Sequence, residues 1–135
     1  MSTRPDLVLI PGLGCTGELY APQRAAMSAL AKPHIANHSG AASMADVARI
    51  ILTSAPAKFA LCGLSMGGYV ALEIMRQAPD RVTRLALLDT SAKPDTPERS
   101  TMRRGQVAQA EAQGLVAAAA ALLPYLVHPR RLTKN

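Results

Sequence analysis

Ser65 is the residue with the clearest chemical potential in this chain, because it is the centre of the sequence GLSMG at residues 63–67. The pattern G-x-S-x-G is typical of a nucleophile elbow, a sharp turn between a strand and a helix that projects a serine hydroxyl. An apolar run over residues 58–62 predicts the strand. A helix over 66–78 is predicted by apolar residues on one face, namely Val70, Ala71, Ile74, Met75 and Ala78. We therefore predict a nucleophilic serine; the alternative is a glycine-rich turn with a solvent-exposed serine.

The glycines of this motif have a predicted steric role. In so tight a turn the strand and the helix pass close together, and a Cβ at Gly63 or Gly67 is expected to collide with its surroundings. The first free N–H groups of the helix are expected beneath the Ser65 hydroxyl. Together with the helix dipole, they favour negative charge at this point.

A second glycine-rich segment follows another predicted buried strand, residues 6–10. Its sequence is PGLGCTG, residues 11–17, and its glycines allow the backbone to approach a ligand closely. Acyl transfer needs two N–H donors aimed at the developing oxyanion. In the elbow architecture one donor is the amide after the nucleophile, here Met66, and the other lies in this loop, here Leu13. A phosphate-binding loop is disfavoured, because no GKS or GKT sequence follows.

A serine nucleophile needs a base, and the chain has three histidines, His34, His38 and His128. In elbow enzymes an acid and then a histidine follow the serine in the chain. His34 begins a predicted strand at 34–38 and is expected at the sheet edge opposite to Ser65. His38 ends that strand at the correct edge but precedes the serine. For all three we favour a structural or solvated histidine over a catalytic one.

Asp89 is a candidate for the acid. It ends a predicted strand at 82–88, at the same edge of the sheet as Ser65. The alternative is that Asp89 caps a turn together with Thr90 and Ser91.

Three segments of the chain resemble the α/β-hydrolase superfamily, in its small esterase, lactonase and haloperoxidase-like branch. LIPGLG at 9–14 is similar to the oxyanion loop, with Pro11 where many members carry a histidine. CGLSMGGYVALE at 62–73 resembles the elbow and its helix, and APDRVTRLALLD at 78–89 resembles the helix end and the following strand.

The resemblance implies a serine hydrolase that acts on a small ester, thioester or lactone through an acyl-enzyme. Ser65 would be the nucleophile, and the N–H groups of Leu13 and Met66 would form the oxyanion hole. No metal or cofactor is implied, and the partner would be a small acyl substrate. Two alternatives remain open: a catalytically silent module that acts by interaction, and another elbow chemistry such as acyl transfer, C–C hydrolysis or perhydrolysis.

The chain reads as an α/β protein, because predicted strands alternate with predicted helices. This pattern predicts a parallel sheet with right-handed crossovers. The resemblance implies that helices cover both faces of this sheet, as in the α/β-hydrolase fold. By resemblance the spatial order of the strands is second, first, third, fourth. The strands are expected at 6–10, 34–38, 58–62 and 82–88, and the helices at 18–30, 43–54 and 66–78, the second of them capped by Ser43.

Two regions are expected. Residues 1–90 would form the amino-terminal half of the hydrolase core, and residues 91–135 the start of a lid or cap, within or after which the chain ends. The usual acid and histidine of the family would then lie beyond Asn135. Residues 91–101 read as a polar connection, and the apolar stretch 114–123, ended by a proline, predicts a packed helix that is too short to span a membrane.

Charge and composition disfavour two classes of binding partner, acidic molecules and nucleic acids. The chain of 135 residues has a net charge of +6. From residue 99 onward the chain has one acidic residue, Glu111, and six basic residues. We interpret the basic residues as a solvated face rather than a site for an acidic partner. They are Arg99, Arg103, Arg104, Arg130, Arg131 and Lys134. Nucleic acid is disfavoured, because one Phe, three Tyr and no Trp leave few side chains for stacking.

Three further expectations concern location and association. The amino terminus has no apolar signal core, which favours the cytoplasm. Cys15 and Cys62 are then expected as free thiols. The apolar strand at 82–88 has no predicted partner on its outer edge, so the chain is expected to self-associate there.

Overall fold

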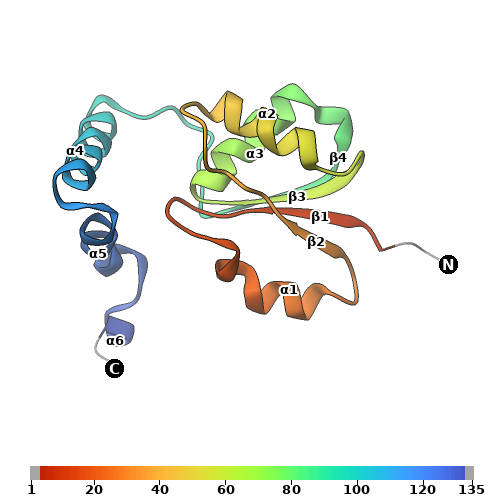
Figure 1. The fold of residues 1–135 in the computed structure, drawn as a ribbon, viewed down its shortest axis with the longest axis horizontal. Helices are drawn as coiled ribbons and strands as arrows, with labels where there is room; N and C mark the ends of the chain where they lie inside the picture. Colours follow the sequence, from red (N-terminus) through yellow and green to blue (C-terminus); the bar gives the residue numbers. More distant parts are fainter. Residues whose placement is uncertain (1–3, 133–135) are drawn as a thin grey trace. The chain divides into compact units, whose positions relative to one another are not determined.

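A computed structural model describes residues 4–132 of the chain. The chain divides into two compact units, Met1–Ala92 and Lys93–Asn135 (Figure 1). The first unit holds all the strands described below, and the second is helical.

The first unit is built on a parallel sheet of four strands. Its strands are β1 (Asp6–Ile10), β2 (Lys32–Ile35), β3 (Phe59–Leu64) and β4 (Val82–Leu88). They lie in the order β2-β1-β3-β4, and every neighbouring pair is parallel. The predicted parallel sheet and its strand order are confirmed.

Helices lie on both faces of this sheet, as predicted (Figure 1). They are η1 (Gly17–Tyr20), α1 (Ala21–Met27), α2 (Met44–Ser54), α3 (Met66–Gln77) and η2 (Pro79–Arg81). Figure 1 shows α1 on one face and α2 with α3 on the other. Ser43 caps α2 as predicted, since its Oγ accepts from the Asp46 N–H at 3.1 Å.

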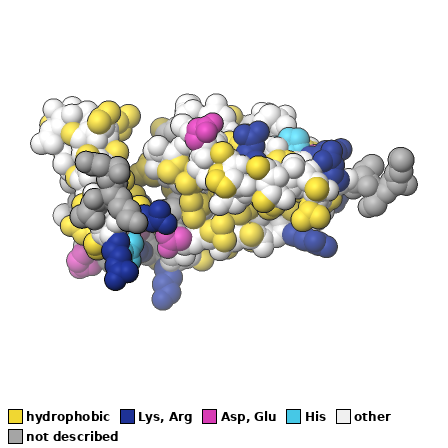
Figure 2. Space-filling model, turned by 90° about the horizontal axis from the view of Figure 1, so that it is seen from below, with side chains coloured by type: hydrophobic (Ala, Val, Ile, Leu, Met, Phe, Trp, Pro, Cys, Tyr) yellow, Lys and Arg dark blue, Asp and Glu magenta, His cyan; other side chains and the backbone are white. Residues whose placement is uncertain are grey.

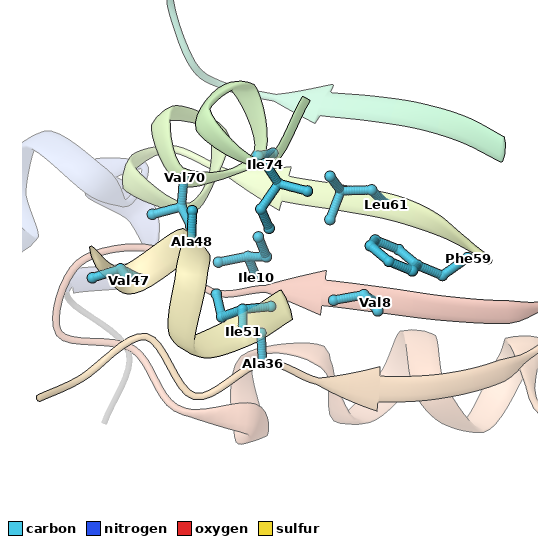
Figure 3. Packing of buried hydrophobic residues seen from close by; sticks show 11 residues of the cluster. Val8, Ile10, Ala36, Val47, Ala48, Ile51, Phe59, Leu61, Val70 and Ile74 are labelled. Atoms are coloured by element: carbon cyan, nitrogen blue, oxygen red, sulfur yellow. The ribbon is translucent and has the colours of Figure 1, made fainter. Parts of the chain in front are cut away.

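The main core lies between the sheet and the pair α2–α3 (Figure 3). Alternate residues of β1 and β3 point into it, because successive side chains of a strand face opposite sides. Its buried members are Val8, Ile10, Ala36, Val47, Ala48, Ile51, Phe59, Leu61, Val70, Ala71 and Ile74. This cluster fixes the position of α3 on β3, and so the start of α3 next to the strand ends.

A smaller cluster lies on the α1 face. Its buried members are Leu9, Tyr20 and Cys62. The Tyr20 hydroxyl donates to the Ile10 carbonyl at 3.1 Å. Ile10 directly precedes the glycine-rich segment at residues 11–17, which we call the first loop. Burial, reinforced by Cys62, raises the pKa of Tyr20 to about 12. The phenol is therefore held in its neutral, hydrogen-bonding form.

Two elements of the first unit differ from their predicted bounds. The strand expected at 34–38 is β2 at Lys32–Ile35. It begins earlier because the Lys32 N–H donates to the Pro5 carbonyl at 2.8 Å, and it ends earlier because the Asn37 side chain turns the chain by accepting from the Ser39 N–H at 3.1 Å. The helix expected at 18–30 is divided into η1 and the short α1.

The second unit contains α4 (Pro97–Gln113), α5 (Leu115–Leu126) and α6 (Pro129–Leu132). The connection predicted at 91–101 is shorter, because Thr96 caps α4 by accepting from the Arg99 N–H at 3.3 Å. Pro124 does not end the apolar helix as predicted. It lies in the last turn of α5, where a missing N–H removes only one hydrogen bond. Whether this unit is the start of a cap stays a prediction.

The two edges of the sheet are protected unequally. β2 carries Lys32 and Pro33, residue types that discourage further strand pairing. Along β4, Leu85, Leu87 and Leu88 are 40%, 39% and 45% exposed. Figure 2 shows hydrophobic side chains on the surface on the α1 side of the molecule.

We expect β4 to mediate self-association of the chain, since an exposed apolar edge strand pairs readily with another chain. Leu85→Lys should weaken this association about tenfold, or about 1.4 kcal/mol, as measured by sedimentation velocity over a range of concentrations. Leu30→Lys is the charge-matched control, because Leu30 is 73% exposed and lies outside the strands. A wild-type chain that sediments as a monomer at every concentration would contradict this expectation.

The Tyr20 phenol predicts a pH effect on stability. A pKa raised from 10.0 to about 12 means that the folded state holds the proton more tightly. Its contribution is fully present below pH 10 and is lost as the pH rises towards the folded value. We expect Tyr20→Phe to lower the free energy of unfolding by about 1 kcal/mol at pH 7 and to flatten its decline between these values, measured by urea unfolding. Tyr125→Phe, at a residue 86% exposed, should change neither quantity.

Candidate functional site

Ser65 lies between β3 and α3 in a backbone conformation that few residues adopt. Its φ is 53° and its ψ is −114°, in the half of the φ range that disfavours side chains with a Cβ. Such strain costs of order 1–3 kcal/mol and persists only where the surroundings hold it. The Ser65 side chain is exposed and makes no hydrogen bond that caps α3. Its hydroxyl is therefore not used by the helix that it precedes.

Two glycines allow the turn to form, as predicted. A Cβ on Gly63 would lie 2.3 Å from the Gly67 carbonyl oxygen. A Cβ on Gly67 would lie 2.3 Å from the Ile10 carbonyl oxygen and 2.7 Å from that of Pro11. These neighbours are backbone atoms, so no side-chain rotation can relieve the clash. Both glycines are required by the approach of α3 to the ends of β3 and β1.

The structure brings the first loop to Ser65. A Cβ built on Gly12 would lie 3.6 Å from the Ser65 Cβ and 3.8 Å from the Cys15 Sγ. Gly12 follows β1 and Ser65 follows β3, two strands that pair in parallel. The carboxyl ends of both strands therefore place the two predicted site segments side by side.

Leu13 lies at the tip of this loop and is 67% exposed. The Cys15 N–H donates to the Gly12 carbonyl at 3.1 Å and closes a turn in which Gly14 has a φ of 69°. A positive φ at this third position is typical of a type II turn. The hydrogen bond of the turn leaves the Leu13 N–H outside it. Met66 begins α3, and its N–H is among the helical amides that have no acceptor within the helix.

The glycines of this loop also have the spacing G-x-G-x-x-G, at residues 12–17. In a dinucleotide-binding fold this spacing opens a helix whose amino terminus holds the pyrophosphate. Here Gly17 begins the four-residue η1, and α1 starts only at Ala21 and has seven residues. The loop lies instead against Ser65, so the spacing alone does not indicate a nucleotide site.

The end of β4 holds the Ser65 backbone on both sides. The Ser65 N–H donates to the Leu88 carbonyl at 2.9 Å, and the Thr90 hydroxyl donates to the Ser65 carbonyl at 2.7 Å. A Cβ on Gly68 would lie 2.3 Å from the Thr90 Oγ1. The sequence had suggested Thr90 only as a partner in a turn. The signal for it was Gly68, a glycine inside a predicted helix, which indicates close approach by another segment.

Asp89 lies between these two partners of Ser65, at the end of β4 as predicted. It is exposed, and its φ is 44°. Aspartate tolerates this left-handed region better than most residues, because its short polar side chain can bond locally. The observed backbone fits the turn-forming alternative, and a role for Asp89 as the acid stays a prediction.

Two of the histidines differ from their predicted positions in the strand β2. His34 is the third residue of β2 rather than the first, and its Nε2 lies 2.7 Å from the Oδ1 of Asp6, the first residue of β1. This pair is at the edge opposite to Ser65. His38 does not end a strand as expected, because β2 ends at Ile35.

His128 belongs to the second unit, where its Nδ1 accepts from the Arg130 N–H at 3.3 Å. This bond is local to the start of α6. Among residues 4–132, no histidine makes a hydrogen bond with the Ser65 hydroxyl. The described residues therefore place no histidine base in contact with the serine.

The two cysteines are free thiols, as expected. Cys62 is buried beside Tyr20, and burial raises the pKa of its thiol. A thiol with a raised pKa is a poor nucleophile at neutral pH. Cys15 is half-buried, and its thiol lies 3.6 Å from the Leu13 carbonyl oxygen. Serine, rather than either cysteine, holds the turn between strand and helix.

The curated proteins that the chain is similar to include two esterases of the same name. The chain is 32% identical over 97 residues to the pimeloyl-[acyl-carrier protein] methyl ester esterase of Vibrio campbellii, and 33% identical over 95 residues to that of Aromatoleum aromaticum. These matches cover 66% and 65% of this chain. The chain spans 38% of the length of each of these relatives. No protein-family model matches the chain.

Solved structures give the same picture. A thermophilic esterase from Thermogutta terrifontis matches with a TM-score of 0.76 and 28% identity, over 90% of this chain and 50% of the esterase. The enol-lactonase from Burkholderia xenovorans LB400 matches with a TM-score of 0.77 and 29% identity, over 91% of this chain and 51% of the lactonase. The fold is therefore shared with about half of each enzyme.

Two kinds of feature are absent from residues 4–132. No helix in this part of the chain is long and apolar enough to cross a bilayer. In the same part, no group of three or more His, Cys, Asp or Glu side chains is placed to hold a metal ion.

The contacts of Gly67 predict a strong effect of a single methyl group. We expect Gly67→Ala to destabilise the fold by about 2 kcal/mol or more, because its Cβ would overlap two backbone carbonyls. Gly12→Ala is the matched control and should stay within about 0.5 kcal/mol of wild type. Its Cβ would lie in ordinary contact, 3.6 Å from the Ser65 Cβ. Urea unfolding measures both, and equal stabilities for the two variants would show that the close approach is not real.

Proposed function

We propose that this chain carries the nucleophile and the oxyanion hole of a serine hydrolase, because it shares the α/β-hydrolase fold with the esterase and the enol-lactonase that it matches. The proposed substrate is a small ester, thioester or lactone. The partial coverage of the relatives fits the amino-terminal part of this fold. The activity proposed is that of the whole protein to which these residues belong.

The observation that carries this proposal is the backbone of Ser65. A serine with a φ of 53° between a parallel strand and a helix is in the strained geometry of a nucleophile elbow. Exposure of its side chain leaves the Oγ accessible to a carbonyl carbon. The close backbone contacts of Gly63 and Gly67 hold Ser65 in this strained conformation.

The proposed oxyanion hole consists of the Met66 and Leu13 N–H groups. Met66 begins α3, where free amides and the helix dipole favour negative charge. Leu13 lies in the loop that Gly12 brings against Ser65. Such preorganised donors stabilise the tetrahedral intermediate, and loss of one donor typically costs about 10²–10³ in kcat.

In the proposed reaction the Ser65 Oγ attacks the carbonyl carbon, and its proton passes through a base to the leaving alcohol or thiol. The acyl group then remains on Ser65 as an ester. Water attacks this ester, releases the carboxylic acid and returns the proton to the serine. In a lactone the leaving alcohol stays attached to the acyl group, so a single hydroxy acid is released.

We place the base and its acid outside the residues described. In elbow enzymes both follow the serine, and the relatives are much longer than the span that this chain covers. Asp89 is the alternative acid. A silent interaction module is the alternative function if no base is supplied, and acyl transfer, C–C hydrolysis and perhydrolysis are the alternative chemistries.

The comparisons favour hydrolysis of esters over these alternatives, because the similar proteins are named as esterases and as an enol-lactonase. Methyl esters are therefore the first substrates to test, followed by thioesters and lactones. No cofactor, metal or nucleic acid is part of the proposal. A cytoplasmic location also stays a prediction.

Labelling with a fluorophosphonate probe tests the nucleophile. The 135-residue chain should label slowly, because residues 4–132 place no base in contact with Ser65. A fusion to the carboxyl-terminal part of the V. campbellii esterase should label at least about 10²-fold faster, since a general base typically contributes about 10²–10⁴-fold. The fusion protein should also hydrolyse a simple methyl ester, which is measured as release of the carboxylic acid.

Ser65→Ala should abolish labelling of both proteins. Ser54→Ala is the matched control, because Ser54 is an exposed serine at the end of α2, and its hydroxyl donates to the Ile51 carbonyl. It should label as wild type does. Labelling that survives Ser65→Ala would assign the nucleophile to another residue.

A further inference from the structure

We infer that Thr90 is a positioning residue of this site: its hydroxyl holds the Ser65–Met66 peptide so that the Met66 N–H faces the oxyanion. The inference rests on the proposed function and adds to it a residue that lies on neither of the two site loops. It is carried by hydrogen bonds at the end of β4.

The Thr90 hydroxyl donates to the Ser65 carbonyl oxygen at 2.7 Å. The same oxygen accepts from the Gly68 N–H at 2.9 Å. One donor comes from α3 itself and the other from the segment after β4. Two donors from different segments fix the direction of this carbonyl more firmly than the helix alone would.

The direction of the Ser65 carbonyl decides the direction of the Met66 N–H. Both groups belong to one planar peptide unit, and in a trans peptide they point in opposite directions. The described chain has no cis peptide bond. A hydrogen bond that holds the carbonyl therefore holds the N–H at the other side of the plane. The same bond polarises the peptide and strengthens the N–H as a donor.

The chain is shaped to bring Thr90 to this position. Asp89 adopts a φ of 44°, so the backbone turns directly after β4. Gly68 leaves space for the threonine, because a Cβ there would lie 2.3 Å from its Oγ1 and 2.6 Å from its Cβ. Both features carry a conformational or entropic cost, and both are explained by the contact between Thr90 and the Ser65 carbonyl.

A purely structural role would predict a different pattern. If Thr90 only packed against α3, valine would replace it well, because valine has nearly the same shape. If the hydroxyl orients the peptide, serine is the better replacement, although it lacks the methyl group. The comparison of these two variants separates packing from positioning.

The experiment uses the 135-residue chain and two readouts. The first is the amide order parameter and dipolar coupling of Met66, measured by NMR without any ligand. The second is the rate of fluorophosphonate labelling of Ser65. Thr90→Val should lower the Met66 order parameter from about 0.85 towards 0.6 and change its coupling. It should slow labelling about tenfold, less than the loss of a whole oxyanion donor.

Thr90→Ser should restore both readouts towards wild type. Thr101→Val is the matched control, since the Thr101 hydroxyl also donates to a carbonyl, that of Pro97 at 3.0 Å, in the other unit. It should change neither readout. Thr90→Ala serves as a second hydroxyl-free variant if Thr90→Val does not fold.

An unchanged Met66 amide in both hydroxyl-free variants would overturn the inference, as would a loss in Thr90→Ser equal to that in Thr90→Val. The proposed function can fail separately. If Ser65 does not label in the wild-type chain or in the fusion protein, the hydrolase proposal fails, and the Met66 amide still decides whether Thr90 holds this peptide.

Discussion

The close approach of three backbone segments around Ser65 is the constraint on which the rest of this structure depends. The end of β1, the turn from β3 into α3 and the segment after β4 meet there around the glycines of the turn. Gly67 lies so close to the carbonyls of Ile10 and Pro11 that a Cβ at this position would overlap them. Parallel pairing of the three strands sets this approach, because it brings all their carboxyl ends to one edge. The core beneath α2 and α3 then fixes α3 against the same edge.

Hydrogen bonds at this edge of the sheet hold backbone conformations that are strained. The positive φ values of Ser65 and Asp89 each carry a conformational cost. They are held by bonds that cross between segments, with the Leu88 carbonyl on one side of Ser65 and the Thr90 hydroxyl on the other. A serine held in this way loses little further entropy when it meets a carbonyl carbon. Rigidity of the backbone is thus the property that a nucleophile and an oxyanion hole both need.

The two faces of the sheet contribute unequally to stability. The α2–α3 face has a continuous buried cluster, whereas the α1 face has three buried residues and a short helix. Tyr20 partly compensates, because its buried hydroxyl ties the α1 side to the Ile10 carbonyl at the start of the first loop. β4 carries the greatest exposure of leucine among the strands, although it also supplies the contacts to Ser65. The strand that holds the Ser65 backbone is therefore also the strand with the most exposed leucines.

The sequence by itself determined the parts that depend on local pattern. Apolar periodicity and the spacing of Gly63, Ser65 and Gly67 predicted the strand, the turn and the helix, because these follow from side-chain alternation and the size of glycine. The alternation of strands and helices predicted a parallel sheet, whereas the order of its strands was predicted from the resemblance to the α/β-hydrolase superfamily. Only the tertiary structure decided where β2 ends, since pairing with β1 and the Asn37 turn set that limit. It also decided the contact of Thr90 with the Ser65 carbonyl. That contact joins residues 25 positions apart through the register of β3 and β4, which no local pattern encodes.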